Sequence, residues 1–218
     1  MVVKACIFDL DGVLVDTARY HYLAWKRLAK EMGFDFTEED NERLKGVSRM
    51  RSLEILLDIG KINVSEKQKL ELAERKNSWY VEYISKMNES EILPGVNDFL
   101  NLLRKSDIKI AVASASKNAK IIIEKTGLGK YLDILVDGTQ IQNAKPDPEI
   151  FLKASQLLGV KPENCVVFED SIAGIKAAKA AGMKCIGVGD SEKLWMADKV
   201  IPDFLGVDLK VLDFEGGV

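Results

Sequence analysis

Histidine and cysteine are scarce in this sequence, which has one histidine, His21, and three cysteines in 218 residues. The cysteines at positions 6, 165 and 185 lack the spacing of metal ligands, and each falls in a stretch that predicts a buried strand. We therefore expect them to be small core residues of a protein in the reducing cytoplasm. No cluster of histidine and cysteine suggests zinc or another metal with soft ligands.

The chain also lacks an excess of positive charge, with 31 basic and 34 acidic residues and a net charge of -3. This balance argues against nucleic acid or an anionic membrane as the main partner. No uncharged apolar stretch is long enough to span a bilayer, and Asp9, Asp11 and Asp16 interrupt the place of a signal peptide's apolar core. No apolar surface stripe is evident. We expect a cytoplasmic monomer whose partner is a small molecule.

An apolar run from Val2 to Phe8, broken only by Lys4, ends in two aspartates, Asp9 and Asp11, and then Gly12. Such a run is typical of a strand buried on both faces. Side chains alternate along a strand, so the two carboxylates are expected to point the same way at its carboxyl end. Three interpretations are open at this point: a metal and nucleophile site, a helix cap, or an ordinary turn.

The remaining chain divides into two parts of different character. Residues 16–92 show helical spacing with no convincing strand, and Ser65 to Gln68 forms a capping-box pattern. From residue 93 onward, strands expected at 108–113, 134–136, 165–168 and 184–188 alternate with helices at 97–105, 119–125, 147–158 and 172–181. Asp147 is expected as the N-cap of the third of these helices. The tail after Ile201 carries too weak a pattern to assign.

This alternation predicts an α/β fold, a doubly wound parallel sheet of the Rossmann-like kind, with an inserted helical cap domain. We expect residues 1–15 and 93–218 to form the core domain and residues 16–92 the cap domain.

Polar residues follow each predicted core strand, where open α/β sheets collect their ligands. They are Asp9 and Asp11, then Ser114, Ala115, Ser116, Lys117 and Asn118, then Lys145 in a loop, and finally Glu169 and Asp170. Each has a plainer explanation alone: Ser116 or Asn118 as an N-cap, Lys145 as a solvated surface charge, Asp170 or Ser171 as a cap.

Four carboxylates at one sheet edge would repel each other without a cation and a lysine among them. Oxygen ligands beside a phosphate site predict Mg²⁺ and phosphoryl transfer.

These residues, in the order Asp9-x-Asp11-Gly12-Val13, Ser114, Lys145-Pro146 and Glu169-Asp170, resemble the four motifs of the haloacid-dehalogenase-like phosphotransferases. The resemblance covers the whole chain and includes the helical insertion as a cap.

The resemblance implies a role for each motif. Asp9 is implied as the nucleophile that becomes an aspartyl phosphate, and Asp11 as the general acid and base. Ser114 and Lys145 are implied to hold the transferring phosphoryl group. One Mg²⁺ per subunit is implied on the carboxylate of Asp9, the backbone carbonyl of Asp11, and the acids Glu169 and Asp170.

Further features resemble the sugar-phosphate mutases of this family more than its phosphatases. They are Asp16-Thr17-Ala18-x-Tyr20-His21 with Trp25, Leu44-Lys45-Gly46-Val47-Ser48-Arg49, Arg75-Lys76-Asn77, and the Ser-Ala-Ser-Lys-Asn segment at 114–118. They imply interconversion of β-D-glucose 1-phosphate and glucose 6-phosphate, with β-glucose 1,6-bisphosphate as intermediate and priming phosphodonor.

Within this reading, the substrate site is expected to include a second phosphate site away from Mg²⁺. Its residues are expected to be Thr17, His21, Trp25, Leu44, Gly46, Val47, Ser48, Arg49, Lys76, Ser114, Ala115, Ser116, Lys117, Asn118 and Lys145. Arg49 is the best candidate for the second phosphate, because a guanidinium binds phosphate bidentately. The resemblance also implies that His21, with Thr17 and Lys76, helps bring Asp11 into its catalytic position as the cap closes.

Four of these cap residues have plainer explanations. Arg49 alone is a common surface charge, Gly46 a common turn residue, and a lone histidine such as His21 is usually packing or surface. Trp25 fits the core of the bundle equally well. Two other functions therefore stay open: a sugar-phosphate phosphatase of the same family, and a non-catalytic binding regulator.

Overall fold

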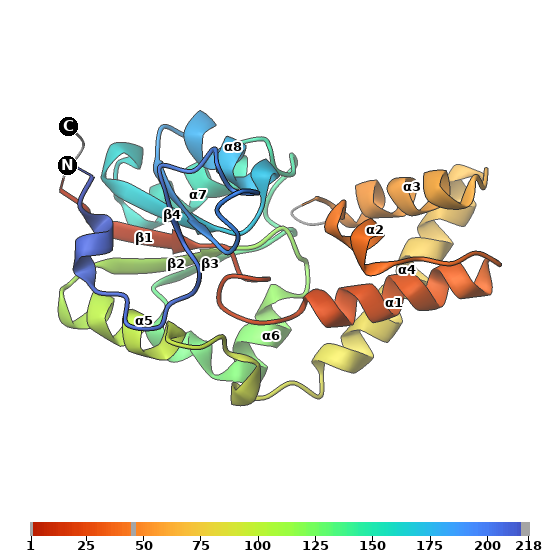
Figure 1. Ribbon diagram of the computed structural model, residues 1–218, viewed down its shortest axis with the longest axis horizontal. Helices are drawn as coiled ribbons and strands as arrows, with labels where there is room; N and C mark the ends of the chain where they lie inside the picture. Colours follow the sequence, from red (N-terminus) through yellow and green to blue (C-terminus); the bar gives the residue numbers. More distant parts are fainter. Residues whose placement is uncertain (1, 45–46, 215–218) are drawn as a thin grey trace.

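The computed structural model describes residues 2–44 and 47–214. In these ranges the centre of the fold is one six-stranded, all-parallel sheet with the order β3-β2-β1-β4-β5-β6 (Figure 1). Its strands are β1 (Ala5–Phe8), β2 (Lys109–Ala113), β3 (Ile134–Val136), β4 (Cys165–Glu169), β5 (Lys184–Val188) and β6 (Lys199–Ile201). Strand β1 lies between β2 and β4, where the strand order reverses. Doubly wound sheets bind their ligands beyond the carboxyl ends of the strands at such a point.

Helices cover both faces of the sheet (Figure 1). On one face lie α5 (Val96–Lys105) and α6 (Ala119–Thr126), and on the other α7 (Glu149–Leu158) and α8 (Ile172–Ala180). Alternate residues of β1 serve the two cores: Phe8 packs with α5 and α6, whereas Ile7 packs with α7 and α8. This double burial explains why β1 is apolar throughout rather than alternating.

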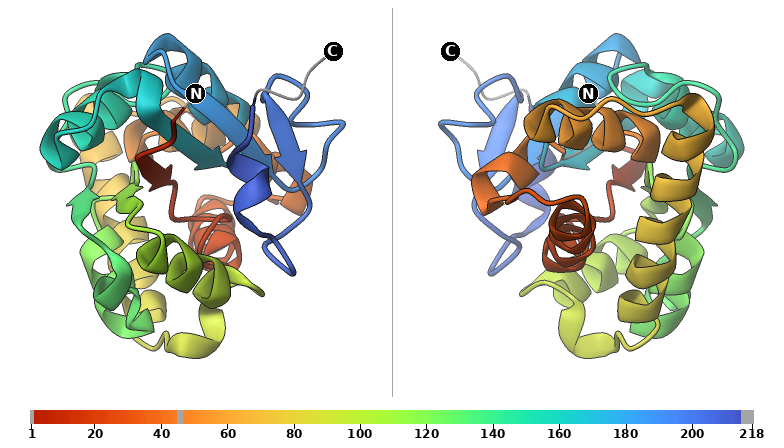
Figure 2. Two further views of the ribbon diagram at one scale, coloured as in Figure 1. Left: turned by 90° about the vertical axis from the view of Figure 1, so that its left-hand side faces the viewer. Right: turned by 90° about the vertical axis from the view of Figure 1, so that its right-hand side faces the viewer.

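Four helices between β1 and α5 form a second body beside the carboxyl ends of the strands (Figures 1 and 2). They are α1 (Ala18–Glu31), α2 (Glu38–Glu42), α3 (Arg49–Gly60) and α4 (Glu66–Ile84). They enclose their own apolar cluster, which includes Trp25, Phe36 and Leu56. Thr37 and Ser65 close capping boxes at the starts of α2 and α4. The four helices lie within residues 16–92, where the sequence shows helical spacing and no strand, while the exact limits of the domains stay a proposal.

Three details differ from the sequence expectations. Strand β1 begins at Ala5 rather than near Val2. Helix α7 begins at Glu149 with Pro148 as N-cap, so Asp147 is not the cap; its carboxylate accepts a hydrogen bond from the amide of Glu149 at 2.9 Å instead. Strand β6 has only three half-buried residues at the sheet edge, too few for a readable period.

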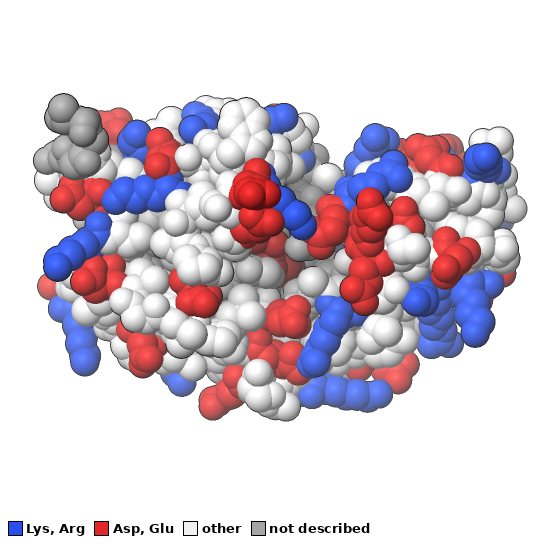
Figure 3. Space-filling view, in the orientation of Figure 1, with Lys and Arg blue, Asp and Glu red and all other residues white. Residues whose placement is uncertain are grey.

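Short 3-10 helices complete the fold: η1 (Glu89–Glu91), η2 (Leu128–Tyr131), η3 (Pro162–Asn164) and η4 (Leu209–Leu212). The segment before η4 inserts Phe204 into the core, where its ring meets those of Phe8, Phe99 and Phe168. Among the described residues, no helix combines the length and apolar character that crossing a bilayer requires. On the face in Figure 3, acidic and basic side chains are interspersed, and the surface is hollowed between the core and the helical body.

Candidate active site

A buried lysine joins the carboxyl ends of two neighbouring strands. The ammonium nitrogen of Lys145 lies 2.5 Å from Oδ1 of Asp9, just after β1, and 2.7 Å from Oε2 of Glu169, the last residue of β4. The side chain of Lys145 is fully buried. The explanation of Lys145 as a solvated surface charge is therefore wrong, because the loop that holds it places its ammonium group in contact with Asp9 and Glu169.

Three carboxyl groups gather around Lys145 at this edge. Oxygen atoms of Asp9, Glu169 and Asp170 all lie within 4.8 Å of one another. Burial raises the pKa of Asp9 well above its ordinary value; Lys145 opposes this, and the nearby acids Glu169, Asp11 and Asp170 add to it. A cluster of carboxylate oxygens with no nitrogen or sulfur ligand among them fits a hard divalent cation such as Mg²⁺.

Two glycines allow the acids to sit this close. A Cβ atom on Gly12, which has φ +83°, would lie 2.3 Å from a carboxylate oxygen of Asp170. A Cβ on Gly174 would lie 2.0 Å from the carboxyl carbon of Glu169. Ser171, rather than Asp170, caps α8: its hydroxyl accepts from the amide of Gly174 at 3.1 Å and donates to Glu169 at 2.7 Å. The capping alternative therefore applies to Ser171.

Asp11 belongs to a different set of contacts from Asp9. The hydroxyl of Thr17 donates to Oδ1 of Asp11 in a short hydrogen bond, and the hydroxyl of Ser114, after β2, lies 3.4 Å from Oδ2. Burial raises the pKa of Asp11, against the effect of these hydrogen bonds and of Lys145. A carboxyl group with a raised pKa next to a cavity suits proton transfer.

A cavity of about 460 Å³ lies between the sheet edge and the helical body. The predicted site residues that line it are Asp9, Asp11, His21, Trp25, Leu44, Val47, Ser48, Arg49, Lys76, Ala115, Ser116, Lys117, Asn118 and Asp170. Four others, Thr17, Ser114, Lys145 and Glu169, are buried and bond directly to Asp9 or Asp11 or to their partners. Gly46 falls outside the described residues.

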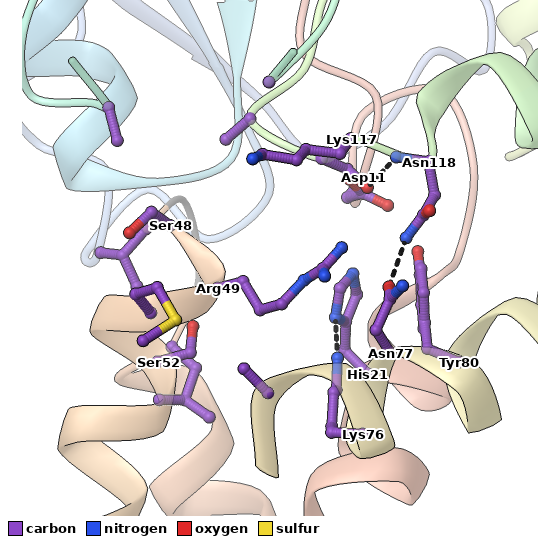
Figure 4. Close-up of a pocket in the computed structure, with 18 of the residues that line it drawn as sticks. Asp11, His21, Ser48, Arg49, Ser52, Lys76, Asn77, Tyr80, Lys117 and Asn118 are labelled. Carbon is purple, nitrogen blue, oxygen red and sulfur yellow. Dashed lines mark hydrogen bonds between the residues drawn. The ribbon is translucent and has the colours of Figure 1, made fainter. Parts of the chain in front are cut away.

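Two cationic side chains, those of Arg49 and Lys117, extend into the cavity (Figure 4). Arg49, the first residue of α3, and Lys117, from the loop after β2, approach it from opposite sides. Arg49 also contacts Glu74, its Nη1 atom 3.3 Å from a carboxylate oxygen. Arginine and lysine that line the same cavity form a natural anion site.

His21 and Lys76 form a buried pair between α1 and α4. Nζ of Lys76 lies 3.0 Å from Nδ1 of His21 and over the rings of Trp25 and Tyr80. Burial and nearby positive charge lower the pKa values of both groups, with Arg49 adding to each. When Lys76 is an ammonium it can only donate, so Nδ1 of His21 then accepts and the ring carries its proton on Nε2.

The loop after β2 also contacts the helical body. The side-chain amide of Asn118 donates to the side-chain oxygen of Asn77 on α4 at 2.9 Å (Figure 4). Asn118 is the N-cap of α6 but makes no side-chain cap bond, while the hydroxyl of Ser116 accepts from its amide at 3.2 Å. The side chain of Asn118 is thus directed at the helical body rather than at its own helix.

Several further residues line the cavity without having been predicted as site residues, among them Asn41, Ser52, Asn77, Tyr80 and Gln142. Tyr80 follows Lys76 by one helical turn, a spacing that places both on one face, so this signal was available. Gln142 belongs to an irregular loop, whose path no local pattern predicts.

Comparison with known proteins identifies the family to which this fold and site belong. The pattern of the haloacid dehalogenase-like hydrolases matches residues 3–182. The chain belongs to the haloacid dehalogenase-like hydrolase family. Within it, the chain is 42% identical to β-phosphoglucomutase of Bacillus subtilis, over 97% of this chain and 95% of that protein. It is also 37% identical to a phosphorylated carbohydrates phosphatase of Thermotoga maritima, over 84% of this chain and 83% of that protein.

A solved structure of another haloacid dehalogenase-like protein resembles the fold over nearly its full length. The crystal structure of β-phosphoglucomutase from Clostridium difficile superposes with a TM-score of 0.92 and 41% identity, covering 97% of this chain and 96% of that one. This similarity includes the helical body as well as the sheet. The family therefore accounts for both parts of the chain.

Proposed function

We propose that the protein is a β-phosphoglucomutase, which interconverts β-D-glucose 1-phosphate and D-glucose 6-phosphate. One observation carries the proposal: the acidic groups, with the nucleophile Asp9, line the same cavity as the phosphate-binding candidates Arg49, Lys117 and Asn118. A mutase must hold a sugar bisphosphate with one phosphate at each place. The cavity volume lies in the range of small-ligand pockets, about 300–1,000 Å³.

The reaction begins with a phosphoryl group on the carboxylate of Asp9. The 6-hydroxyl of β-glucose 1-phosphate attacks phosphorus, the bond between Asp9 and phosphorus breaks, and Asp11 takes the hydroxyl proton. The resulting β-glucose 1,6-bisphosphate reorients. Asp9 then attacks the phosphorus at position 1, Asp11 returns the proton to the departing sugar oxygen, and glucose 6-phosphate leaves.

Charge neutralisation is the task of the surrounding residues. Lys145 and Ser114 hold the phosphoryl oxygens beside Asp9. The carboxylates of Asp9, Glu169 and Asp170, with the backbone carbonyl of Asp11, are the groups we propose for Mg²⁺, which neutralises phosphoryl charge when bound.

The helical body has the task of binding sugar and excluding water. Arg49 holds the second phosphate with Lys117 and Asn118, and the bulky side chains of Trp25 and Leu44 border the sugar. Exclusion of water matters because water that reaches the aspartyl phosphate would convert mutase into phosphatase turnover. We propose residues 16–92 as the cap domain and residues 1–15 and 93–218 as the core, in a monomeric cytoplasmic enzyme.

A phosphatase acting on sugar phosphates is the second candidate, supported by the 37% identity to the carbohydrate phosphatase. A product assay separates the two: β-glucose 1-phosphate with Mg²⁺ and a trace of β-glucose 1,6-bisphosphate, with glucose 6-phosphate and inorganic phosphate measured in one tube. We expect glucose 6-phosphate to exceed phosphate greatly. Phosphate release that matches substrate loss would establish the phosphatase, and binding without turnover by either route would favour a regulator.

A further inference from the structure

Tyr80 carries a buried hydroxyl that makes no hydrogen bond within the described part of the chain in this arrangement. The residue lies on α4, is 1% exposed and lines the cavity. Among the described residues its hydroxyl has no hydrogen-bond partner. A buried unpaired hydroxyl destabilises a fold, and phenylalanine would fill the same space without that penalty. The hydroxyl therefore points to a second arrangement of the site in which it is bonded.

The ring of Tyr80 supports the His21–Lys76 pair. It stacks on the imidazole of His21 with ring centroids 4.1 Å apart and an interplanar angle of 29°. The ammonium of Lys76 lies 4.7 Å from the centroid of the same ring. Stacking and cation–π contacts of this kind fix the orientation of both partners. The ring thus has a role in packing that phenylalanine would share, which separates it from the hydroxyl.

The hydroxyl faces the groups that hold Asp11. The carboxylate of Asp11 and the hydroxyls of Thr17 and Ser116 are the polar side chains that act on it most strongly. Thr17 is fully buried, and its single hydroxyl proton goes to Oδ1 of Asp11. Ser116 already accepts from the amide of Asn118.

Asp11 cannot keep all of its present contacts while it exchanges a proton with a substrate. Both of its oxygens are engaged, one by Thr17 and one by Ser114. Once Oδ1 turns to a sugar hydroxyl, the buried hydroxyl of Thr17 loses its acceptor. The oxygen of Tyr80 makes no hydrogen bond to any described residue in the present arrangement and lies near enough to Thr17 for the two side chains to interact.

We propose that Tyr80 is a positioning residue for Asp11: its hydroxyl accepts the hydrogen bond of Thr17 when Asp11 engages the substrate. The proposal rests on the proposed function insofar as Asp11 is the general acid and base. Tyr80 itself acts through Thr17 and makes no contact with the reacting atoms. This hydrogen bond would give the unpaired hydroxyl of Tyr80 a partner that neither packing nor substrate binding provides.

Tyr80→Phe tests the proposal because it removes the hydroxyl and keeps the ring. We expect kcat with β-glucose 1-phosphate to fall roughly tenfold, KM to change less than about twofold, and the thermal midpoint to stay equal or rise. Tyr83→Phe is the matched control, since Tyr83 lies on the same helix and its ring stacks on Tyr20 instead. Wild-type kcat in Tyr80→Phe, or a fall in its thermal midpoint alongside kcat, would overturn the proposal.

A double-mutant cycle with Thr17→Val tests the pathway. Without the hydroxyl of Thr17, Tyr80 has nothing to accept, so Tyr80→Phe is expected to change kcat little on that background. Independent, multiplicative losses would show that Tyr80 does not act through Thr17. Both products are measured throughout. If the wild-type protein releases phosphate in place of glucose 6-phosphate, the proposed function fails, whereas the cycle is still read from phosphate release, since Asp11 serves either reaction.

Discussion

The side-chain amide of Asn118, at the start of α6, donates to the side-chain oxygen of Asn77 on α4 over 2.9 Å. This hydrogen bond joins the loop after β2 directly to the helical body above it. It also directs an amide of the proposed phosphate site toward a cap residue. The position of the helical body over the sheet edge is therefore coupled to the residue that is expected to meet a phosphate.

Asn77→Ala is expected to raise KM for β-glucose 1-phosphate with little change in kcat. Loss of one hydrogen bond of this kind is worth about 1 kcal/mol, or roughly a fivefold change in an equilibrium. Asn101→Ala is the matched control, because Asn101 donates to the hydroxyl of Tyr131 on the far side of the core at 3.4 Å. Steady-state kinetics on both variants measures the effect, and equal changes in the two would argue against the coupling.

Arg49→Ala is expected to reduce mutase turnover far more than phosphorylation of Asp9 by a small phosphodonor such as acetyl phosphate. The guanidinium serves the second phosphate, which a small donor lacks. Arg51→Ala provides the control, since Arg51 is exposed and pairs with Glu54 one turn along the same helix. Rapid-quench measurement of the phosphoenzyme alongside the coupled mutase assay compares the two steps; losses of similar size in both would refute the second-phosphate role.

His21 is expected to titrate below the ordinary imidazole pKa of 6.5, because burial, Lys76 and Arg49 all disfavour its charged form. As the only histidine, it gives one imidazole signal in an NMR titration without assignment work. Lys76→Met removes one of the two nearby charges, so the pKa of His21 is expected to move upward. An unchanged titration in that variant would contradict the pairing.

The same shift predicts a pH dependence of stability. Below pH 6.5 the unfolded chain takes up a proton that folded His21 refuses, so the free energy of unfolding falls as the pH drops toward the folded pKa. Urea denaturation of wild type and His21→Gln between pH 7.5 and 5.5 isolates this contribution as the difference between the two slopes. Parallel slopes would show that His21 titrates normally.

Lys145→Met is expected to destabilise the protein by about 3–5 kcal/mol, because it leaves two buried carboxylates without their ammonium. The pKa of Asp9, already raised, would rise further, so the carboxyl group is charged less readily in the folded than in the unfolded chain. The deficit is therefore expected to be larger at pH 8 than at pH 5 in urea unfolding with EDTA. Lys184→Met, which breaks an exposed pair with Asp198, should lose no more than about 1 kcal/mol.

Much of the architecture could be predicted from the hydrophobic periodicity of the sequence and from the order of its expected strands and helices. The apolar run before Asp9, the alternation after residue 93 and the capping box at Ser65 are local features, and local sequence specifies them well. Parallel topology then places every strand's carboxyl end at one edge, so Asp9 and Glu169 were expected to meet. The edge strand β6 escaped prediction because its three residues gain their order from β5 rather than from their own pattern.

The remaining parts of the site depend on packing over long sequence distances. A loop lysine such as Lys145 looks like surface until the path of its loop is known. The spacing of Lys76 and Tyr80 places both on one face of α4, but only the orientation of α4 over the sheet decides that this face and Asn77 meet the cavity. The resemblance to the haloacid dehalogenase-like family supplied roles for Arg49 and His21 that the residues alone did not.

The position of β1 in the middle of the sheet has a consequence for biosynthesis. The strand that leads to the nucleophile leaves the ribosome first, yet its two neighbours are residues 109–113 and 165–169. The helical body between them is complete long before either arrives, and it closes its own apolar cluster without the sheet. Pairing across such sequence separations is slow, so during translation one edge of β1 stays unpaired until β4 emerges, even after β2 is available for the other edge. A nascent chain arrested before β4 should therefore expose this strand to chaperones while its helical part is already folded.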